Sequence, residues 1–518
     1  MNGGSGRGAR RQAQTVENGA GGLGWVDRGE DPHRPTAVGH VRLPRWPARS
    51  LKWSLGCGRS TSDVATFVFI PFHWAANLNA TFAVARRLRR RGHRVCYLGI
   101  PDSAKRIRSQ GFDVTPIFDQ VFPEGSVVER CAREARGELL GAQEFRARVR
   151  GMCTFLRAGE IERCVRHLSP DLFLVSSLTP WVAMAARRIG LPVVTFSSSL
   201  PSIRDPQMPP IGTGLIPRQT LASRLRVRTA WSTLSIRRRL LERDWDISGE
   251  LVDFARWCDY PSTGLDFRGE TWPRLSLPSL VFCPREFDFP RRTVPEEILF
   301  VEPSVDTERC EPDFPWHRLA DDHPIVYCTL GSVATFKFIP EATRFFQAFM
   351  DAMARRPSWQ GVVAIGNHLR VEDFVRPANV IIVREAPQVG LLRRAALMVS
   401  HGGFGGVKES IYMGVPMLLV PLFYDQPGTA ARVVHHGMGV RGRPGKVSAR
   451  TLGDWMDRVL GDPSYRERTQ SMSATFVALQ DRAPSALILE RLARSPRPLD
   501  RGATGDRISS SPGPSVAF

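Results

Sequence analysis

Residues 400–439 decide the fold of the second half of this chain, and they read SHGGFGGVKESIYMGVPMLLVPLFYDQPGTAARVVHHGMG. An apolar run at 397–400 ends at a glycine-rich loop, which a helical pattern follows. Residues 415–422 form the next apolar run, and a polar turn then leads into another helical pattern. This alternation of short apolar runs and helices predicts a parallel α/β sheet.

The glycine loop predicts a site for phosphate. Gly402, Gly403 and Gly405 leave backbone N–H groups uncovered immediately before a helix begins. Unpaired amides and the helix dipole both favour an anion at that end. Glu409 lies near the start of the same helix, where its carboxylate could accept hydrogen bonds from a ribose diol.

The order of polar residues in this stretch resembles the sugar-nucleotide signature of the family 1 UDP-glycosyltransferases. That signature is H-G-G-x-[NG]-[ST]-x-x-E, followed by G-V-P, D-Q and A-x-R. The matching positions are His401, Gly402, Gly403, Gly405, Glu409, Gly414-Val415-Pro416, Asp425-Gln426 and Arg432. The similarity is closest to the bacterial macrolide and carotenoid glycosyltransferases. A generic βαβ unit with a glycine turn is the alternative interpretation, but it leaves the polar residues at the strand ends unexplained.

The resemblance implies the GT-B architecture, an α/β fold with two doubly wound Rossmann-like domains that face a cleft. Repeated strand-and-helix patterns between 64 and 494 agree with it. The expected divisions are a disordered tail at 1–63, an N-terminal acceptor-binding domain at 64–290, a linker at 291–318, a C-terminal nucleotide-sugar-binding domain at 319–494 and a disordered tail at 495–518. The arginine-rich segment 205–270 is implied to build the acceptor pocket.

The resemblance also assigns roles on the donor side. His401 is implied to hydrogen-bond a phosphate, and Ser332 to contact the diphosphate. Asp425 and Gln426 are implied to hold sugar hydroxyls, and Glu409 the ribose. A histidine that caps the strand and a helix N-cap at Asp425 are the structural alternatives.

The element that binds the base departs from the family pattern. Pro387 and Gln388 are retained, and the backbone of Gln388 is implied to meet the base edge. Glu385 stands where the family often has an aromatic residue that stacks on the base, and Gly406 replaces a serine or threonine. The nucleotide could therefore be UDP or TDP. No metal or other cofactor is expected, because positive groups and helix dipoles can neutralise the leaving diphosphate and no cluster of acids and histidines has the spacing of metal ligands.

The catalytic side departs further. In the family, a histidine in the first strand–helix loop deprotonates the acceptor and an aspartate orients it, but the aligned positions are Asn77 and Ser176. Asparagine cannot act as a base. His73, four residues upstream in the same loop, is the candidate replacement, and a loop histidine packed by Phe72 and Trp74 is the alternative. An amine, an acid or another activated acceptor that needs little help from a base is the second possibility.

Composition restricts the partners and the location. The net charge of +20 would permit nucleic-acid binding, but no recognition motif accompanies it, so no nucleic acid is expected. A weak attraction to an anionic membrane surface stays open. No apolar stretch reaches the ~18 residues of a spanning helix, and no signal peptide is recognisable. Nine cysteines without C-x-x-C pairs favour reduced thiols in the cytoplasm.

The sequence thus predicts an inverting glycosyltransferase that moves a hexose from a nucleotide sugar to a small, apolar natural product. A catalytically impaired homologue that binds donor and assists a partner is the main alternative, because both members of the catalytic pair are absent. A sugar-nucleotide epimerase is a third possibility, although no pair of acids suited to elimination is recognisable.

Overall fold

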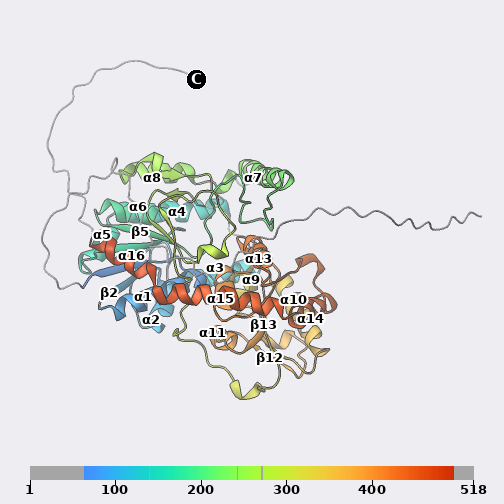
Figure 1. Ribbon diagram of the computed structural model, residues 1–518. Helices are drawn as coiled ribbons and strands as arrows, with labels where there is room; N and C mark the ends of the chain where they lie inside the picture. Colours follow the sequence, from blue (N-terminus) through green and yellow to red (C-terminus); the bar gives the residue numbers. More distant parts are fainter. Residues whose placement is uncertain (1–63, 139–140, 242, 270–271, 495–518) are drawn as a thin grey trace, which may run out of the picture. The chain divides into compact units, whose positions relative to one another are not determined.

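Two parallel sheets with flanking helices organise the protein, as a computed structural model shows (Figure 1). The structure describes residues 64–138, 141–241, 243–269 and 272–494. The tails predicted at 1–63 and 495–518 lie outside these described residues. Within them, no helix is long and apolar enough to cross a membrane.

The first sheet has seven parallel strands in the order β3-β2-β1-β4-β5-β8-β9. They are β1 (Thr66–Ile70), β2 (Arg94–Gly99), β3 (Asp113–Pro116), β4 (Leu172–Ser176), β5 (Val193–Ser197), β8 (Ser279–Val281) and β9 (Ile298–Phe300). Every residue of β1 and β4 is buried, as expected for strands covered on both faces. The strand order reverses between β1 and β4, so the loops that follow these strands meet at one edge.

Six helices accompany the first five strands: α1 (Ala75–Arg90), α2 (Pro101–Ser109), α3 (Ser126–Ala135), α4 (Ala142–Arg157), α5 (Glu160–Arg166) and α6 (Pro180–Arg188). The first helix ends just before a glycine. Gly92 follows it with a φ of +86°, a left-handed conformation that favours glycine.

The segment 205–270 contains one long helix and several short elements. Its elements are α7 (Leu221–Leu241), η1 (Arg243–Trp245), α8 (Ser248–Trp257), η2 (Ser262–Gly264) and β6 (Leu265–Asp266), which pairs antiparallel with β7 (Arg274–Leu275). A cavity of about 170 Å³ lies against α7. Its lining includes Val227 of that helix and His435 of the second half.

The second sheet has six parallel strands in the order β12-β11-β10-β13-β14-β15. They are β10 (Ile325–Thr329), β11 (Gln360–Ala364), β12 (Val380–Val383), β13 (Ala395–Ser400), β14 (Met417–Leu419) and β15 (Gly439–Arg441). The helices are α9 (Gly331–Lys337), α10 (Ile339–Ala354), α11 (Gln388–Leu392), α12 (Phe404–Tyr412), α13 (Gln426–His435) and α14 (Ala449–Gly461). The strand order reverses between β10 and β13, which brings their loops together.

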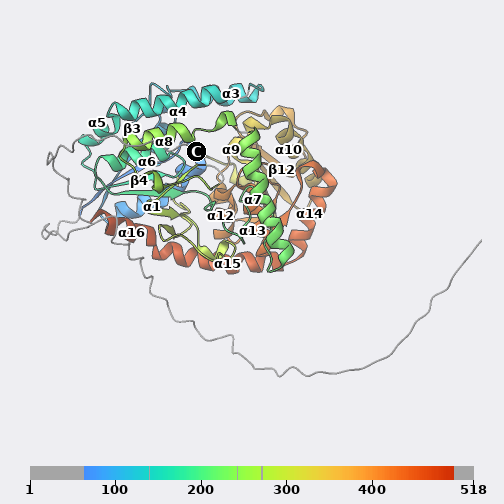
Figure 2. The same cartoon turned by 90° about the horizontal axis from the view of Figure 1, so that it is seen from above.

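Two segments join the halves more closely than the predicted divisions suggest. The segment predicted as a linker contains β9, which pairs with β8 in the first sheet. At the other end, α15 (Ser464–Arg482) leads into α16 (Pro484–Ala493), which lies beside α1 in both views (Figures 1 and 2). His93 Nε2 lies 2.9 Å from Glu490 Oε1, so the last helix is anchored on the first half.

An apolar cluster shared by both halves supports the site region. Leu200 and Phe287 of the first half belong to the same buried cluster as Phe404 and Val407 of α12. The rings of Phe287 and Phe404 lie 6.0 Å apart. The helix that follows the glycine loop is therefore packed directly against the first half of the chain.

Candidate donor-binding site

His401 lies between the two loops that follow β10 and β13. A Cβ atom added to Gly331 would lie 2.8 Å from Cε1 of His401, and one added to Gly403 would lie 2.5 Å from its Nε2. Any side chain at either glycine would therefore collide with the imidazole. The arrangement brings His401 against the loop that carries Ser332. The side chain of Ser332 is exposed.

The imidazole of His401 is neutral near pH 7. Burial lowers its pKa to about 4, although the backbone at Thr329 acts in the opposite direction. Its Nδ1 is buried and makes no hydrogen bond of ordinary geometry within the described residues. A neutral ring next to the N-terminus of α12 can offer a hydrogen bond to a phosphate oxygen without being charged.

Glu409 is held by two side chains. Arg309 Nη1 donates to its Oε1 at 2.5 Å and Arg309 Nη2 to its Oε2 at 3.1 Å. Gln388 Nε2 donates to Oε2 at 2.6 Å, while Gln388 Oε1 accepts a hydrogen bond from Tyr327. Burial opposes the charge on Arg309, but Glu409 and Glu311 outweigh it and raise the pKa of the guanidinium. The carboxylate predicted to bind ribose is thus fixed in place by an arginine.

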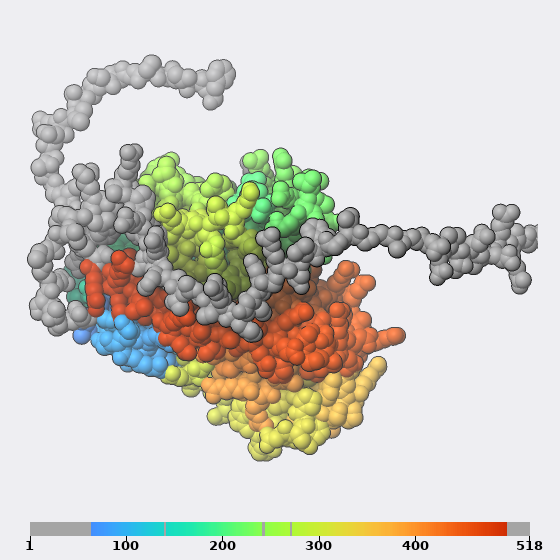
Figure 3. All heavy atoms as spheres, viewed as in Figure 1, coloured from blue at the N-terminus to red at the C-terminus, as the bar shows by residue number. Residues whose placement is uncertain are grey.

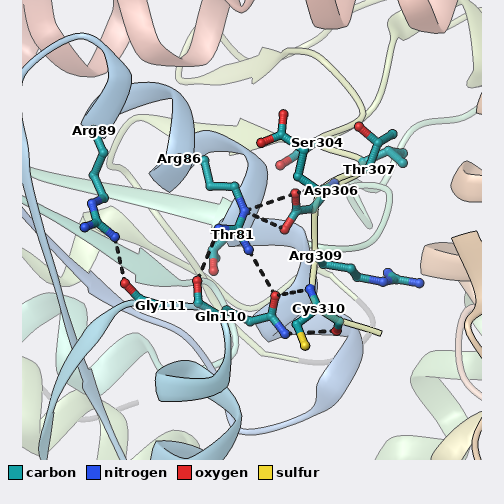
Figure 4. A network of polar contacts seen from close by, with 12 residues as sticks. Thr81, Arg86, Arg89, Gln110, Gly111, Ser304, Asp306, Thr307, Arg309 and Cys310 are labelled. Carbon is teal, nitrogen blue, oxygen red and sulfur yellow. Dashed lines mark hydrogen bonds and ion pairs between the residues drawn. The ribbon is translucent and has the colours of Figure 1, made fainter. Parts of the chain in front are cut away.

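Arg309 belongs to a segment that the first half of the chain positions (Figure 4). Asp306 accepts from Arg86 Nε at 3.1 Å, and Arg86 Nη2 donates to Gln110 Oε1 at 3.0 Å. Gln110 also pairs with the backbone of Cys310, accepting from its N–H at 2.9 Å and donating to its carbonyl at 3.2 Å. Contacts on both sides of Arg309 therefore anchor it to α1 and to the end of α2.

The base-edge element is tied to the same segment. Glu311 accepts hydrogen bonds from the backbone N–H groups of Val389 (2.8 Å) and Gly390 (2.9 Å) in the first turn of α11. Pro387, immediately before that helix, is buried. At the position of the family aromatic residue, Glu385 accepts from Asn367 Nδ2 at 2.9 Å and is exposed.

Asp425 points toward the first half. Ser199 Oγ, in the loop after β5, donates to Asp425 Oδ2 at 2.5 Å. Burial raises the pKa of Asp425, although this hydrogen bond favours the ionised form. Gln426 faces its own turn, because its Oε1 accepts from the N–H groups of Leu422 (2.8 Å) and Phe423 (3.1 Å).

Asn77 is hydrogen-bonded to Ser198, the residue next to Ser199. Its Oδ1 accepts from the N–H of Phe72 at 2.7 Å, and its Nδ2 donates to Ser198 Oγ at 3.1 Å. Both polar ends of the amide are therefore used to hold loops. Ser198 and Ser199 are adjacent. Asn77, at the position of the family base, and Asp425, the acid predicted to bind sugar, are therefore hydrogen-bonded to the same short loop.

His73 lies in a pocket with two arginines. The Nη2 atom of Arg130 is 3.4 Å from His73 Nε2, and the ring of Phe72 is 4.2 Å away between centroids. Burial lowers the pKa of His73 to about 3, and the charges of Arg130 and Arg148 act in the same direction. His73 is therefore neutral, because a further positive charge beside Arg130 and Arg148 is strongly disfavoured.

Ser176, at the position of the family aspartate, serves its own turn. It is fully buried at the end of β4. Its Oγ accepts from the N–H of Leu178 at 3.3 Å, and its carbonyl accepts from Thr179 just before α6. These hydrogen bonds are local, and they use Ser176 to hold the turn that leads into that helix.

Three residues at or next to the site were missed by reasoning from the sequence. Arg309 and Ser199 meet their partners across 100 and 226 positions of the chain, from segments without apolar periodicity. Lys408 is buried in α12, where its Nζ donates to the carbonyls of Phe282 (2.9 Å) and Pro303 (2.7 Å). Burial lowers its pKa to about 8. The only sequence signal is weak: the serine-rich run 197–199 follows a buried strand.

Comparison with known proteins identifies relatives of this chain. Residues 280–481 match the family model for UDP-glucoronosyl and UDP-glucosyl transferases. The NDP-glycosyltransferase YjiC of Bacillus subtilis (strain 168) is 29% identical over 207 residues, which are 39% of this chain and 50% of that protein. The chain thus aligns with about half the length of this relative.

Two longer alignments extend the similarity over both halves. The zeaxanthin glucosyltransferase of Pantoea ananas is 23% identical over 445 residues, which cover 84% of this chain and 96% of that protein. The crystal structure of the calicheamicin glycosyltransferase CalG4 superposes with a TM-score of 0.58 at 24% identity. It covers 85% of this chain and all of that one, and at this identity it shows the fold alone. The chain thus has the two parallel sheets of the GT-B fold, and its residues 280–481 match the UDP-glucoronosyl and UDP-glucosyl transferase family.

Proposed function

We propose that this protein is an inverting glycosyltransferase that moves a hexose from a UDP or TDP sugar to a small, apolar natural product. One observation carries the proposal. His401, Glu409 and Asp425 lie in the segments that follow β13 and β14 of the second sheet, and Asp425 is hydrogen-bonded to Ser199 of the first half. The names of the relatives, an NDP-glycosyltransferase and a zeaxanthin glucosyltransferase, support the same reaction class.

In the proposed complex, the N-terminus of α12 and His401 hold the diphosphate, with Ser332 beside them. Glu409 accepts hydrogen bonds from the ribose hydroxyls, and Asp425 and Gln426 form hydrogen bonds with the hydroxyls of the sugar. An electron pair of the acceptor forms the bond to the anomeric carbon while the carbon–oxygen bond to phosphate breaks. The diphosphate leaves with that bond's electron pair, and the helix dipole stabilises its charge.

His73 stays the candidate base, and its surroundings define what it can do. A histidine with a pKa of about 3 is a weak acceptor for the proton of an alcohol. Arg130 and Arg148 next to it would, in turn, stabilise an anion. The pocket therefore favours an acceptor that ionises readily, such as a phenol, over an aliphatic alcohol.

A donor-binding auxiliary protein is the second candidate. The observation in its favour is that the side chains of Asn77 and Ser176 are engaged in holding loops and a helix start. The donor side agrees with both candidates, since Arg309 and Gln388 orient the carboxylate of Glu409. That orientation argues only against a scaffold that binds no donor.

The test is release of nucleoside diphosphate from UDP-glucose and TDP-glucose, without acceptor and then with matched phenolic and aliphatic acceptors. We expect acceptor-dependent release that is faster with phenols, and a product of inverted anomeric configuration by NMR. His73→Gln should slow the aliphatic acceptors more than the phenols if His73 is the base. Donor binding by calorimetry without release from any acceptor would support the auxiliary function, and a free epimerised sugar would point to an epimerase.

A further inference from the structure

The helix α7 presents a stripe of apolar side chains to solvent. Leu221, Leu225, Ile236 and Leu240 are 82%, 65%, 57% and 73% exposed. At 3.6 residues per turn, these four positions fall within an arc of about 100° on one side of the helix. Large aliphatic side chains aligned in this way usually mark an interaction surface.

The opposite side of α7 is fixed to the protein. Val227 and Trp231 are buried there, and Trp231 Nε1 donates to the carbonyl of Met208 at 2.8 Å. The helix lies at the surface in both ribbon views, and its green segment protrudes in the space-filling view (Figures 1, 2 and 3). The orientation of the stripe is therefore set by packing on the other face.

Arginines border the stripe on both sides. The helix contains six arginines and no acidic residue. By helical position, Arg224, Arg228 and Arg239 follow one edge of the stripe and Arg226 and Arg237 the other. An apolar face between two rows of arginine is typical of helices that lie in the plane of a membrane interface.

We propose that α7 docks this protein onto an anionic membrane surface. Leu225 and Ile236 would enter the boundary between headgroups and acyl chains, while the arginines meet lipid phosphates. Trp245, which is 42% exposed in the short helix after α7, has the amphipathic ring that favours this interface. A second copy of the chain is a poor occupant, because pairing of two such stripes would bring the five bordering arginines of one copy close to those of the other, without an acid on either helix.

The inference is independent of the proposed transferase activity, since it rests on α7 alone. It is tested with the full chain and vesicles of phosphatidylcholine, either pure or mixed with phosphatidylglycerol. In a co-sedimentation assay we expect binding to the mixed vesicles only, and a decrease as the NaCl concentration rises. The double variant Arg228→Gln/Arg239→Gln should bind several-fold more weakly with a smaller salt dependence.

The decisive variant is Leu225→Glu/Ile236→Glu, which we expect to weaken vesicle binding roughly tenfold or more. Its matched control is Val375→Glu/Leu487→Glu, which changes two exposed apolar residues elsewhere and should bind like the unmodified protein. Circular dichroism of both variants checks that they are folded. Equal binding by these two variants, or no binding to the mixed vesicles at all, would overturn the proposal. Self-association that only the α7 variant abolishes, without vesicle binding, would assign the stripe to a second copy.

Discussion

Arg309 and Glu409 form a buried ion pair although 100 residues separate them in the chain. Their side chains are each only 9% exposed, and Gln388 shares the same carboxylate. The family signature includes the glutamate, whereas the arginine comes from an irregular segment anchored by α1. The first half of the chain thus contributes to the geometry of the donor site of the second.

Replacing Arg309 should damage both stability and donor binding. Arg309→Gln leaves a buried carboxylate with one neutral partner, and breaking such a pair typically costs about 3–5 kcal/mol. We expect a lower melting temperature and a dissociation constant for UDP or TDP at least roughly tenfold higher by calorimetry. Glu308→Gln, at the neighbouring exposed position, is the control and should change neither. Tighter nucleotide binding at an unchanged melting temperature would mean that Arg309 competes with the ribose.

Gly403 should not tolerate even a methyl group. Its φ of −59° suits alanine, so only the contact with His401 Nε2, 2.5 Å from the added Cβ, opposes the substitution. The ring is also close to Gly331, where an added Cβ would meet the same Cε1 and Nε2 atoms. We expect Gly403→Ala to weaken nucleotide binding by roughly ten- to a hundredfold in a calorimetric titration.

The control for this substitution is Gly445→Ala, where an added Cβ meets nothing within 4 Å. It should bind nucleotide like the unmodified protein. Equal nucleotide binding by the two alanine variants would show that the imidazole can move away from the added methyl group. Close packing of His401 against its glycine neighbours would then not be required for nucleotide binding.

The fold could be predicted from sequence where apolar runs and glycines recur at regular distances. The strands β1, β4 and β13 are fully apolar or nearly so, and Gly402 and Gly403 mark the loop before α12. The strands β8 and β9 have three residues each, which is too short for a periodic signal. The packing of α16 on α1 was also not predictable, since an amphipathic pattern does not reveal which surface it covers.

The site divides in the same way. The glycines, His401, Glu409 and Asp425 belong to one continuous stretch, so their order alone indicated a common site. Ser199 and Arg309 reach it through tertiary contacts between irregular segments, and irregular segments carry no periodicity from which a contact can be inferred. The environment of His73 was likewise hidden, because Arg130 and Arg148 come from helices that the sequence did not connect to the first loop.

The hydrogen bond from Ser199 to Asp425 should affect the sugar more than the nucleotide. Asp425→Asn keeps the shape but removes the charge that sugar hydroxyls would meet, and hydrogen bonds to charged groups contribute about 1.5–3 kcal/mol. We expect kcat/KM to fall by roughly ten- to a hundredfold, with affinity for free UDP or TDP unchanged. Ser199→Ala should cause a smaller loss, and Asp454→Asn, at an exposed position, none. Equal losses of nucleotide and nucleotide-sugar binding would show that Asp425 shapes the loop and not the sugar site.

His401 should make the protein less stable in mild acid. An unfolded histidine takes up a proton near pH 6.5, but the buried ring has its pKa lowered to about 4. Between these values the unfolded state binds more protons, so the free energy of unfolding falls as the pH decreases from 6.5 to 4. At about 1.36 kcal/mol per pKa unit, His401 contributes about 3 kcal/mol to this loss. Above pH 6.5 it contributes no pH dependence, because the ring is neutral in both states.

Urea unfolding at a series of pH values measures this contribution. His401→Gln cannot titrate, so its unfolding free energy should decline less steeply between pH 6.5 and 4, even if the variant is less stable at neutral pH. The lowered pKa of His73, about 3, extends the acid loss below pH 4 and should persist in this variant. His323→Gln, which removes an exposed histidine, should follow the unmodified protein. Parallel curves for His401→Gln and the unmodified protein would show that His401 is accessible to protons in the native state, and a neutral imidazole could then not be part of the phosphate site.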